Sequence, residues 1–115
     1  MTTKGIEAVF LETHNWGATA KFFQRLGYEL ELDTGHQSGQ LRNGDGPYVF
    51  IAEVPEDQPT GTRLVLRVDD VADLDAAGLD VVTSFRPTHW GTQELTVRDP
   101  DGRLWSVQAP AEATS

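Results

Sequence analysis

The segment RNGDGPYVFI at residues 42–51 recurs in the second half of the chain as RDPDGRLWSV at residues 98–107. In both copies, a polar turn built from Asn, Asp, Pro and Gly precedes a run of apolar and aromatic residues. Those turn residues supply the backbone conformations of a tight hairpin, and the apolar run that follows is typical of a strand. The recurrence therefore predicts two copies of one supersecondary unit.

The beginnings of the two halves also match. VFLETHN at residues 9–15 aligns with LVLRVDD at residues 64–70. Both segments predict a strand that ends at a helix cap, because Asn15 and Asp70 can accept hydrogen bonds from the free amides of the next turn. Asp70 together with Asp73 resembles a capping box.

A helix is expected after each cap, over residues 16–26 in the first half and residues 71–77 in the second. Gly27 and Gly78 follow these segments, where a helix favours a left-handed residue. The second half is longer between its helix and its final turn. Because a proline and a glycine interrupt residues 85–91, the extra residues are predicted to form a loop there.

Each half therefore has the predicted order strand, helix, strand, strand, strand. The fold class is α+β, with two tandem βαβββ modules that form a curved eight-stranded sheet around a concave ligand groove. Module one covers about residues 5–54, the Pro-containing linker about 55–60, and module two about 61–110. A chain of 115 residues fits one such domain.

The net charge and the absence of cysteine exclude several classes of ligand and chemistry. The formal charge is -9, which repels phosphate backbones and makes nucleic acid an unfavourable ligand. The chain has no cysteine, so it offers no disulfide, thiolate nucleophile or sulfur-rich zinc site. No signal peptide or membrane span can be identified, and a cytoplasmic location with no membrane partner is expected.

The repeated module and the DPDG turn at residues 99–102 resemble the vicinal oxygen chelate superfamily over nearly the whole chain. The segment HWGTQELTVRDP at residues 89–100 is most similar to the bleomycin-resistance branch. Members of that branch bind a drug without altering it. The resemblance implies a homodimer whose two clefts combine modules from both chains, and a two-fold axis is also the common symmetry of small homo-oligomers.

Catalytic members of the superfamily hold a divalent metal at four positions, which correspond here to Ala8, Phe50, Arg63 and Ser106. Only the serine hydroxyl is even a weak ligand for an oxygen- or nitrogen-preferring metal. A shift of one residue would bring Glu7 into the first position, but alternation would then turn the apolar residues of the strand to the wrong face. No metal, no cofactor and no catalytic residue is therefore expected.

Strand alternation separates a groove face from a core face. The predicted groove mixes aromatic rings with polar groups, as small-molecule sites do, although the rings could instead fill a groove without function. Trp90 is interpreted as a ligand lid, with contact to a neighbouring subunit as the alternative. Glu12 could contact a cationic ligand group or pair with Arg67. The predicted ligand-binding residues are Phe10, Glu12, His36, Ser38, Gln40, Tyr48, Phe50, Arg63, Trp90, Glu94, Thr96, Leu104 and Ser106.

These observations favour a protein that sequesters a bulky, partly aromatic antibiotic or natural product without a metal. One rival is a metal-dependent glyoxalase-type or dioxygenase-type enzyme with unconventional ligands. A second is a metal-free carrier of a biosynthetic intermediate, which would bind many related scaffolds weakly. His14, His36 and His89 could together serve as metal ligands, but no pair of them has the short spacing of a metal motif. The enzyme hypothesis would draw its ligands from Glu7, Glu12, His36, His89 or Glu94.

Overall fold

The structure is a computed structural model that describes residues 3–111. It contains two compact units. The first unit is Ala8–Arg63, and the second combines Leu64–Ser115 with Met1–Glu7. Each unit has a hydrophobic core of its own. Within the described residues, no helix combines the length and the apolar character needed to cross a membrane.

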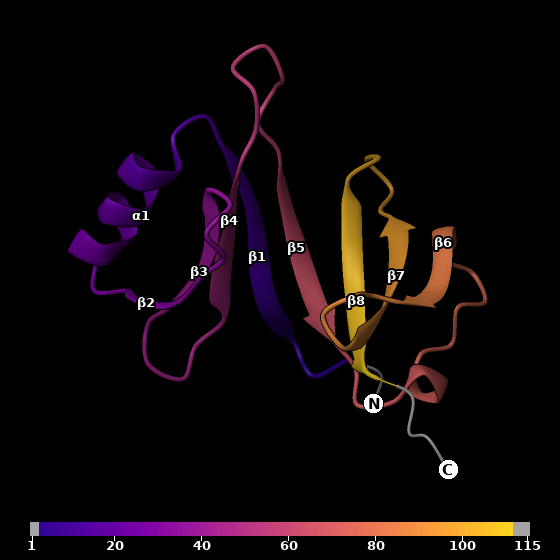
Figure 1. The fold of residues 1–115 in the computed structure, drawn as a ribbon. Helices are drawn as coiled ribbons and strands as arrows, with labels where there is room; N and C mark the ends of the chain where they lie inside the picture. Colours follow the sequence, from indigo (N-terminus) through magenta and orange to yellow (C-terminus); the bar gives the residue numbers. More distant parts are fainter. Residues whose placement is uncertain (1–2, 112–115) are drawn as a thin grey trace. The chain divides into compact units, whose positions relative to one another are not determined.

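The first unit is a four-stranded sheet with one helix (Figure 1). Its strand order is β2-β3-β4-β1, in which β1 and β4 are parallel and the other neighbours are antiparallel. The parallel pair requires a long connection, which α1, β2 and β3 provide. The elements are β1 (Ile6–Thr13), α1 (Trp16–Arg25), β2 (Glu29–Asp33), β3 (Ser38–Arg42) and β4 (Tyr48–Glu53).

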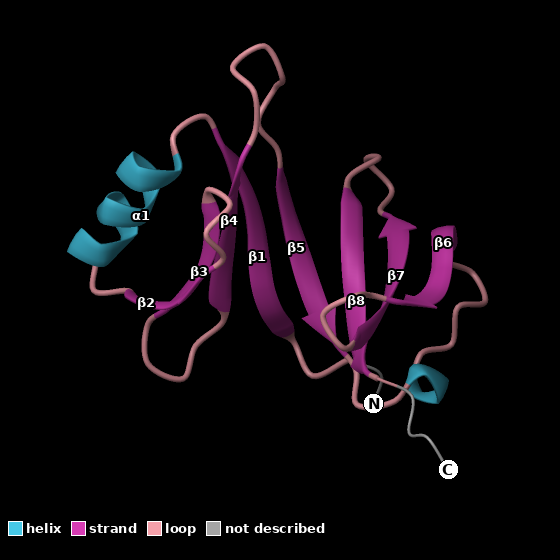
Figure 2. Ribbon diagram, viewed as in Figure 1, coloured by secondary structure: helices cyan, strands magenta, loops and turns pink. Residues whose placement is uncertain are grey.

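The second unit repeats this arrangement with the order β5-β8-β7-β6, and its parallel pair is β5 with β8 (Figure 2). Its elements are β5 (Thr62–Arg67), a single 3₁₀ turn (Val71–Asp73), β6 (Asp80–Pro87), β7 (Thr92–Arg98) and β8 (Leu104–Pro110). The predicted α+β class and the eight strands are confirmed. The concave ligand groove stays a prediction.

Helix α1 forms where the sequence predicts it. The Asn15 side chain accepts a hydrogen bond from the Ala18 amide at 3.0 Å, and Gly27 adopts a left-handed φ of 96° just past the helix. At the first helical residue, the Trp16 amide donates to Glu53 Oε1 at 2.8 Å, which ties the helix to the end of β4. The Trp16 ring packs against the buried cluster of Leu41, Val49 and Ile51, so α1 covers one face of the sheet.

The helix predicted over residues 71–77 is wrong, because only one 3₁₀ turn forms there. The Asp70 carboxylate accepts from the Ala72 amide, and the Asp75 carboxylate accepts from the Ala77 amide. These local bonds offer the backbone two turns in place of helical hydrogen bonds. Between them, Leu74 is extended and packs on the core of the second unit. A segment this short has little intrinsic helix stability to oppose that contact.

The predicted loop at residues 85–91 is also too long. Strand β6 continues to Pro87, and the turn that follows is closed by a 2.9 Å hydrogen bond from the Thr88 amide to the Thr92 carbonyl. The extra residues of this half lie partly in β6, whose pairing with β7 shifts register twice. Because β6 is the last strand of the unit's order, its proline interrupts no second ladder. Bulged edge strands absorb insertions in this way.

The turn at residues 99–102 is held by one carboxylate. Asp99 Oδ1 accepts from the amides of Asp101 and Arg103, both at 2.9 Å. Asp99 Oδ2 accepts from the Trp105 indole at 3.0 Å and from Arg103 Nη1 at 3.1 Å. The indole hydrogen bond is the largest cause that lowers the pKa of Asp99 from 3.8 to about 2.

This carboxylate makes the second unit sensitive to acid. A group whose pKa is depressed in the folded state stabilises the fold above its unfolded pKa, and that stabilisation disappears as the pH falls through the folded value. Wild type is therefore expected to melt at a higher temperature than Asp99→Asn near neutral pH, and the difference should shrink between pH 3.8 and about 2. Thermal melts followed by circular dichroism at several pH values test this. A difference that is constant with pH would contradict the assignment to Asp99.

Candidate functional site

Two phenylalanines form the centre of the candidate site in the first unit. Phe10 on β1 lies directly opposite Phe50 on the parallel strand β4, so both side chains point to the same face of the sheet. Their ring centroids are 5.9 Å apart and their planes differ by 9°. Both residues are partly exposed. Gln40 on β3 is paired with Phe50 from the other side and extends the row.

Charged and polar groups border these rings. The Arg42 guanidinium lies 5.3 Å from the centre of the Tyr48 ring, and its Nε is 3.1 Å from Glu31 Oε1. Gln40 Nε2 donates to the same Glu31 oxygen at 3.0 Å. These bonds, first from Gln40 and then from Arg42, lower the pKa of Glu31. We call this surface the ring face, and it comprises Phe10, Glu31, Gln40, Arg42, Tyr48 and Phe50.

The ring face contains four of the residues predicted from sequence, and two of its members were missed. Arg42 follows the same alternation as Ser38 and Gln40, so extending the pattern by one step would have found it. Glu31 could not be found by alternation, since the pairing of β2 with β3 shifts register between Leu30 and Leu32. Such a bulge changes the face to which a residue points.

Other predicted residues of the first unit have local structural contacts. Glu12 Oε1 accepts from the Gly61 amide at 2.9 Å, which holds the linker against β1. Ser38 Oγ is 2.6 Å from the hydroxyl of Thr34, inside the turn between β2 and β3. His36 is exposed in that turn, and Arg63 is partly buried on β5. A role of these four residues in ligand binding stays a prediction.

The predicted residues of the second unit lie on neighbouring strands. Thr96 is paired with Ser106, and Glu94 is paired with Gln108, so these side chains share one face of β7 and β8. Leu104 is paired with Arg98 in the same ladder. Ser106 is only 1% exposed.

Trp90 occupies the turn between β6 and β7, where it is 55% exposed and contacts the His89 ring edge to face at 4.8 Å. This exposure is compatible with either a ligand lid or a contact to another subunit. Both interpretations of Trp90 stay predictions.

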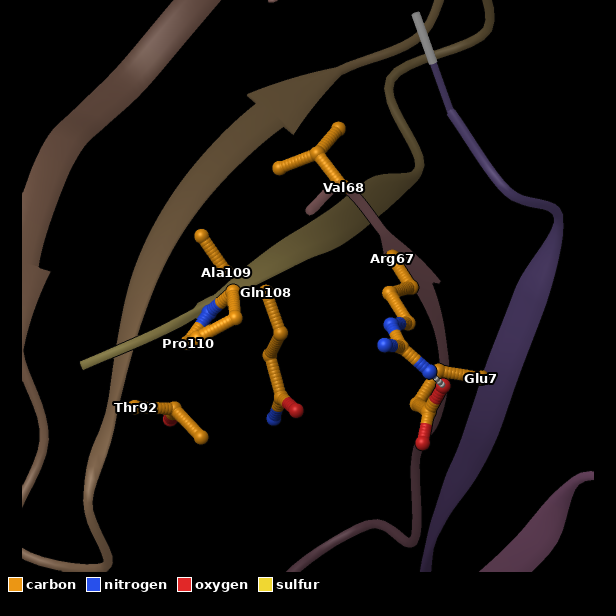
Figure 3. Close-up of a pocket in the computed structure, with 7 residues that line it drawn as sticks. All are labelled: Glu7, Arg67, Val68, Thr92, Gln108, Ala109 and Pro110. Atoms are coloured by element: carbon orange, nitrogen blue, oxygen red, sulfur yellow. Dashed lines mark ion pairs between the residues drawn. The ribbon is translucent and has the colours of Figure 1, made fainter. Parts of the chain in front are cut away.

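A small pocket of about 140 Å³ lies in the second unit (Figure 3). Its polar lining includes Glu7, Arg67 and Gln108, none of which is among the ligand-binding residues predicted from sequence. Figure 3 shows Glu7 and Arg67 joined by an ion pair, with Gln108 and Thr92 extending from the adjacent strands. The lining residues are Glu7, Arg67, Val68, Thr92, Gln108, Ala109 and Pro110.

The four positions that the resemblance to the vicinal oxygen chelate superfamily implies for a metal carry unsuitable side chains. Ala8 and Phe50 offer only hydrocarbon, Arg63 offers a cation, and Ser106 offers a neutral hydroxyl. This set does not fit a divalent metal, which requires carboxylate, imidazole or comparable donors. Among residues 3–111, no group of three or more His, Cys, Asp or Glu side chains is placed to hold an ion elsewhere.

Comparison with known proteins agrees with this architecture. The chain superposes on a glyoxalase/bleomycin resistance protein/dioxygenase superfamily member from Vibrio splendidus with a TM-score of 0.69 and 19% identity, covering 89% of this chain and 96% of that one. For methylmalonyl-CoA epimerase from Mycobacterium tuberculosis, the TM-score is 0.71 and the identity is 15%, with 96% and 91% covered. At these identities the likeness shows the fold alone.

The chain spans less than half the length of a third similar structure. The Mn(II)-bound glyoxalase from Novosphingobium aromaticivorans gives a TM-score of 0.72 at 18% identity, and the match covers 99% of this chain but only 42% of that enzyme. None of the curated proteins matches the chain. The sequence profile of the glyoxalase-like domain matches residues 8–108. The chain therefore belongs to the glyoxalase-like domain family, within the vicinal oxygen chelate superfamily.

Proposed function

We propose that this protein binds and sequesters a bulky, partly aromatic natural product, such as an antibiotic, without a metal and without changing it chemically. The observation that carries the proposal is the stacked pair of Phe10 and Phe50. The resemblance to the superfamily implies that Phe50 corresponds to a position where catalytic members place a metal ligand. A ring at that position offers dispersion and stacking to a ligand in place of a coordination bond.

The geometry of the pair suits an aromatic ligand. Parallel rings with centroids 5.9 Å apart are too close to admit a third ring between them. Their partly exposed surfaces instead form one apolar platform on which a planar group can stack. Each aromatic contact of this kind contributes about 0.5–1.5 kcal/mol beyond the area that it buries.

The polar border of the ring face provides orientation. The Glu31 carboxylate accepts hydrogen bonds from Gln40 and Arg42, which fix its position beside the rings and lower its pKa. A ligand with a hydrogen-bond donor or a cationic group beside its aromatic part would match this arrangement. We further propose that the protein acts in the cytoplasm as a homodimer, the oligomeric state that the resemblance to the bleomycin-resistance branch implies.

The effect of Phe50→Ala on ligand affinity tests the platform. The chain has three tryptophans, whose fluorescence can follow titration with glycopeptide, enediyne and aromatic antibiotics. For any ligand that binds wild type, Phe50→Ala should weaken binding by about tenfold or more, because truncating a central aromatic contact costs about 2 kcal/mol. Phe22→Ala is the matched control, since Phe22 is 57% exposed on α1 and does not belong to the ring face. It should leave affinity unchanged.

The same titration separates the rival functions. Recovery of the ligand unchanged from protein without stoichiometric metal would support sequestration. Stoichiometric metal in the purified protein, with conversion of an added compound, would refute it in favour of an enzyme. Weak binding to many related scaffolds, with no protection of a host cell from any drug, would instead indicate a carrier.

A further inference from the structure

The pocket of the second unit contains polar groups with unused hydrogen-bonding capacity. Glu7 Oε2 and Arg67 Nη1 are 3.9 Å apart, which is an attraction between charges but too long for a hydrogen bond. Arg67 has a second ion pair with Asp69 at 3.4 Å. Within residues 3–111, no side-chain hydrogen bond involves Glu7, Arg67 or Gln108. The Glu7 side chain is nevertheless only 29% exposed.

The strand register brings these groups to one place. Arg67 on β5 is paired with Gln108 on β8, and Gln108 is paired in turn with Glu94 on β7. Paired residues share a face of the sheet, and Figure 3 shows the Gln108 and Arg67 side chains extending separately from neighbouring strands. The remaining lining consists of the apolar residues Val68, Ala109 and Pro110 and the polar Thr92, whose hydroxyl is 2.9 Å from that of Thr88. Val68 and Ala109 are buried, with 0% and 3% exposure.

The balance of charge argues against a charged ligand. Within the lining, Glu7 carries the negative charge and Arg67 the positive charge, and the charge of Arg67 is further offset by Asp69, which does not line the pocket. A carboxylate ligand would gain Arg67 but would face Glu7, and a cationic ligand would gain Glu7 but would face Arg67. A neutral group that has a hydrogen-bond acceptor and a donor on adjacent atoms satisfies both side chains at once.

We propose that this pocket binds a carboxamide or lactam group. The carbonyl oxygen accepts a hydrogen bond from the Arg67 guanidinium, and the N–H donates to the Glu7 carboxylate. Gln108 can donate to the same carbonyl or accept from a second N–H. A small aliphatic group attached to the amide packs on Val68, Ala109 and Pro110. The inference does not rest on the proposed function, since no member of the ring face lines this pocket.

Three ligands of nearly the same shape test this assignment on the 115-residue chain. Isobutyramide has the donor and the acceptor, isobutyrate has only acceptors and a negative charge, and isobutyramidine has only donors and a positive charge. None carries a ring that could stack on the ring face. NMR titration of ¹⁵N-labelled protein should show isobutyramide binding about tenfold more tightly than either ion, the equivalent of one charge-assisted hydrogen bond. The Gln108 side-chain amide should shift.

Glu7→Gln provides the decisive variant. Removal of the carboxylate should weaken the binding of isobutyramide by about tenfold. It should strengthen the binding of isobutyrate, because Arg67 then faces no acidic lining residue. Glu29→Gln is the matched control, since it makes the same change of charge at an exposed position of β2. It should change the affinity for neither ligand. Equal affinity for the three ligands, or the same response in both variants, would overturn the proposal. Phe50→Ala should leave isobutyramide binding intact even where it abolishes binding at the ring face.

Discussion

Replacing Ile51 with alanine is expected to lower the free energy of unfolding by about 2–5 kcal/mol. Ile51 is 0% exposed and lies at the centre of the first unit's core, beside Leu41 and Val49. It is paired with Leu11 on one side and Gly39 on the other, so sheet backbone surrounds the position and limits collapse around a cavity. Urea unfolding followed by circular dichroism measures the loss.

The size of this effect should follow the volume that is removed. Ile51→Val deletes one methylene group and is expected to cost about 0.5–1.5 kcal/mol. If both variants unfolded at the wild-type urea concentration, the buried position assigned to Ile51 would be wrong. A loss for alanine with a smaller loss for valine is the pattern of a well-packed core.

Gly39→Ala is expected to have the second large effect, at about 1–3 kcal/mol of destabilisation or more. A methyl group at this position would collide with the Leu32 carbonyl oxygen and would lie 2.6 Å from Cη2 of the Trp16 ring. The backbone oxygen belongs to the neighbouring strand and cannot move without disturbing the ladder. The Trp16 indole is held in place because it packs against the buried core of the first unit. Thermal unfolding of the variant measures the cost.

Gly17→Ala is the matched control for this clash. Gly17 lies inside α1, and the nearest atom to its added methyl group would be Asn15 Oδ1 at 3.8 Å, an ordinary contact. Because alanine favours the helical conformation over glycine, this substitution should stabilise the protein by up to about 1 kcal/mol. Opposite signs for the two glycines are therefore expected. Destabilisation by Gly17→Ala equal to that of Gly39→Ala would point to a general intolerance of alanine instead of a specific collision.

The sequence was sufficient to predict those parts of the fold that depend on local chemistry. Asn15 caps α1, and Gly27 ends it, because both effects involve only neighbouring backbone. The second helix was predicted by analogy with the first, and it fails because Asp70 and Asp75 form competing turns. Local sequence alone does not decide between a helix and two turns here, because the outcome also depends on the packing of Leu74 against the core of the second unit.

Prediction of the candidate site had the same limit. Alternation along β1 and β4 correctly placed Phe10 and Phe50 on one face, since a regular strand preserves its pattern. It missed Glu31, whose position follows a register shift in β2 that no local pattern signals. From the sequence, Glu7 is suggested only as an alternative metal ligand and not as part of a pocket. Its partner Arg67 is distant in sequence, and only the folded second unit brings the two together.

The connectivity of the two units also has a consequence for biosynthesis. The first unit is one continuous segment, whereas the second needs residues from both sides of it. Lys4 and Gly5 join the second unit through backbone hydrogen bonds to Arg67, at 2.7 and 3.1 Å. On the ribosome, Ala8–Arg63 emerges complete before most of the second unit has been made, and N-terminal regions generally fold first. Lys4 and Gly5 can take their places only after the strands of the second unit have been synthesised, so the first unit is expected to fold before the second.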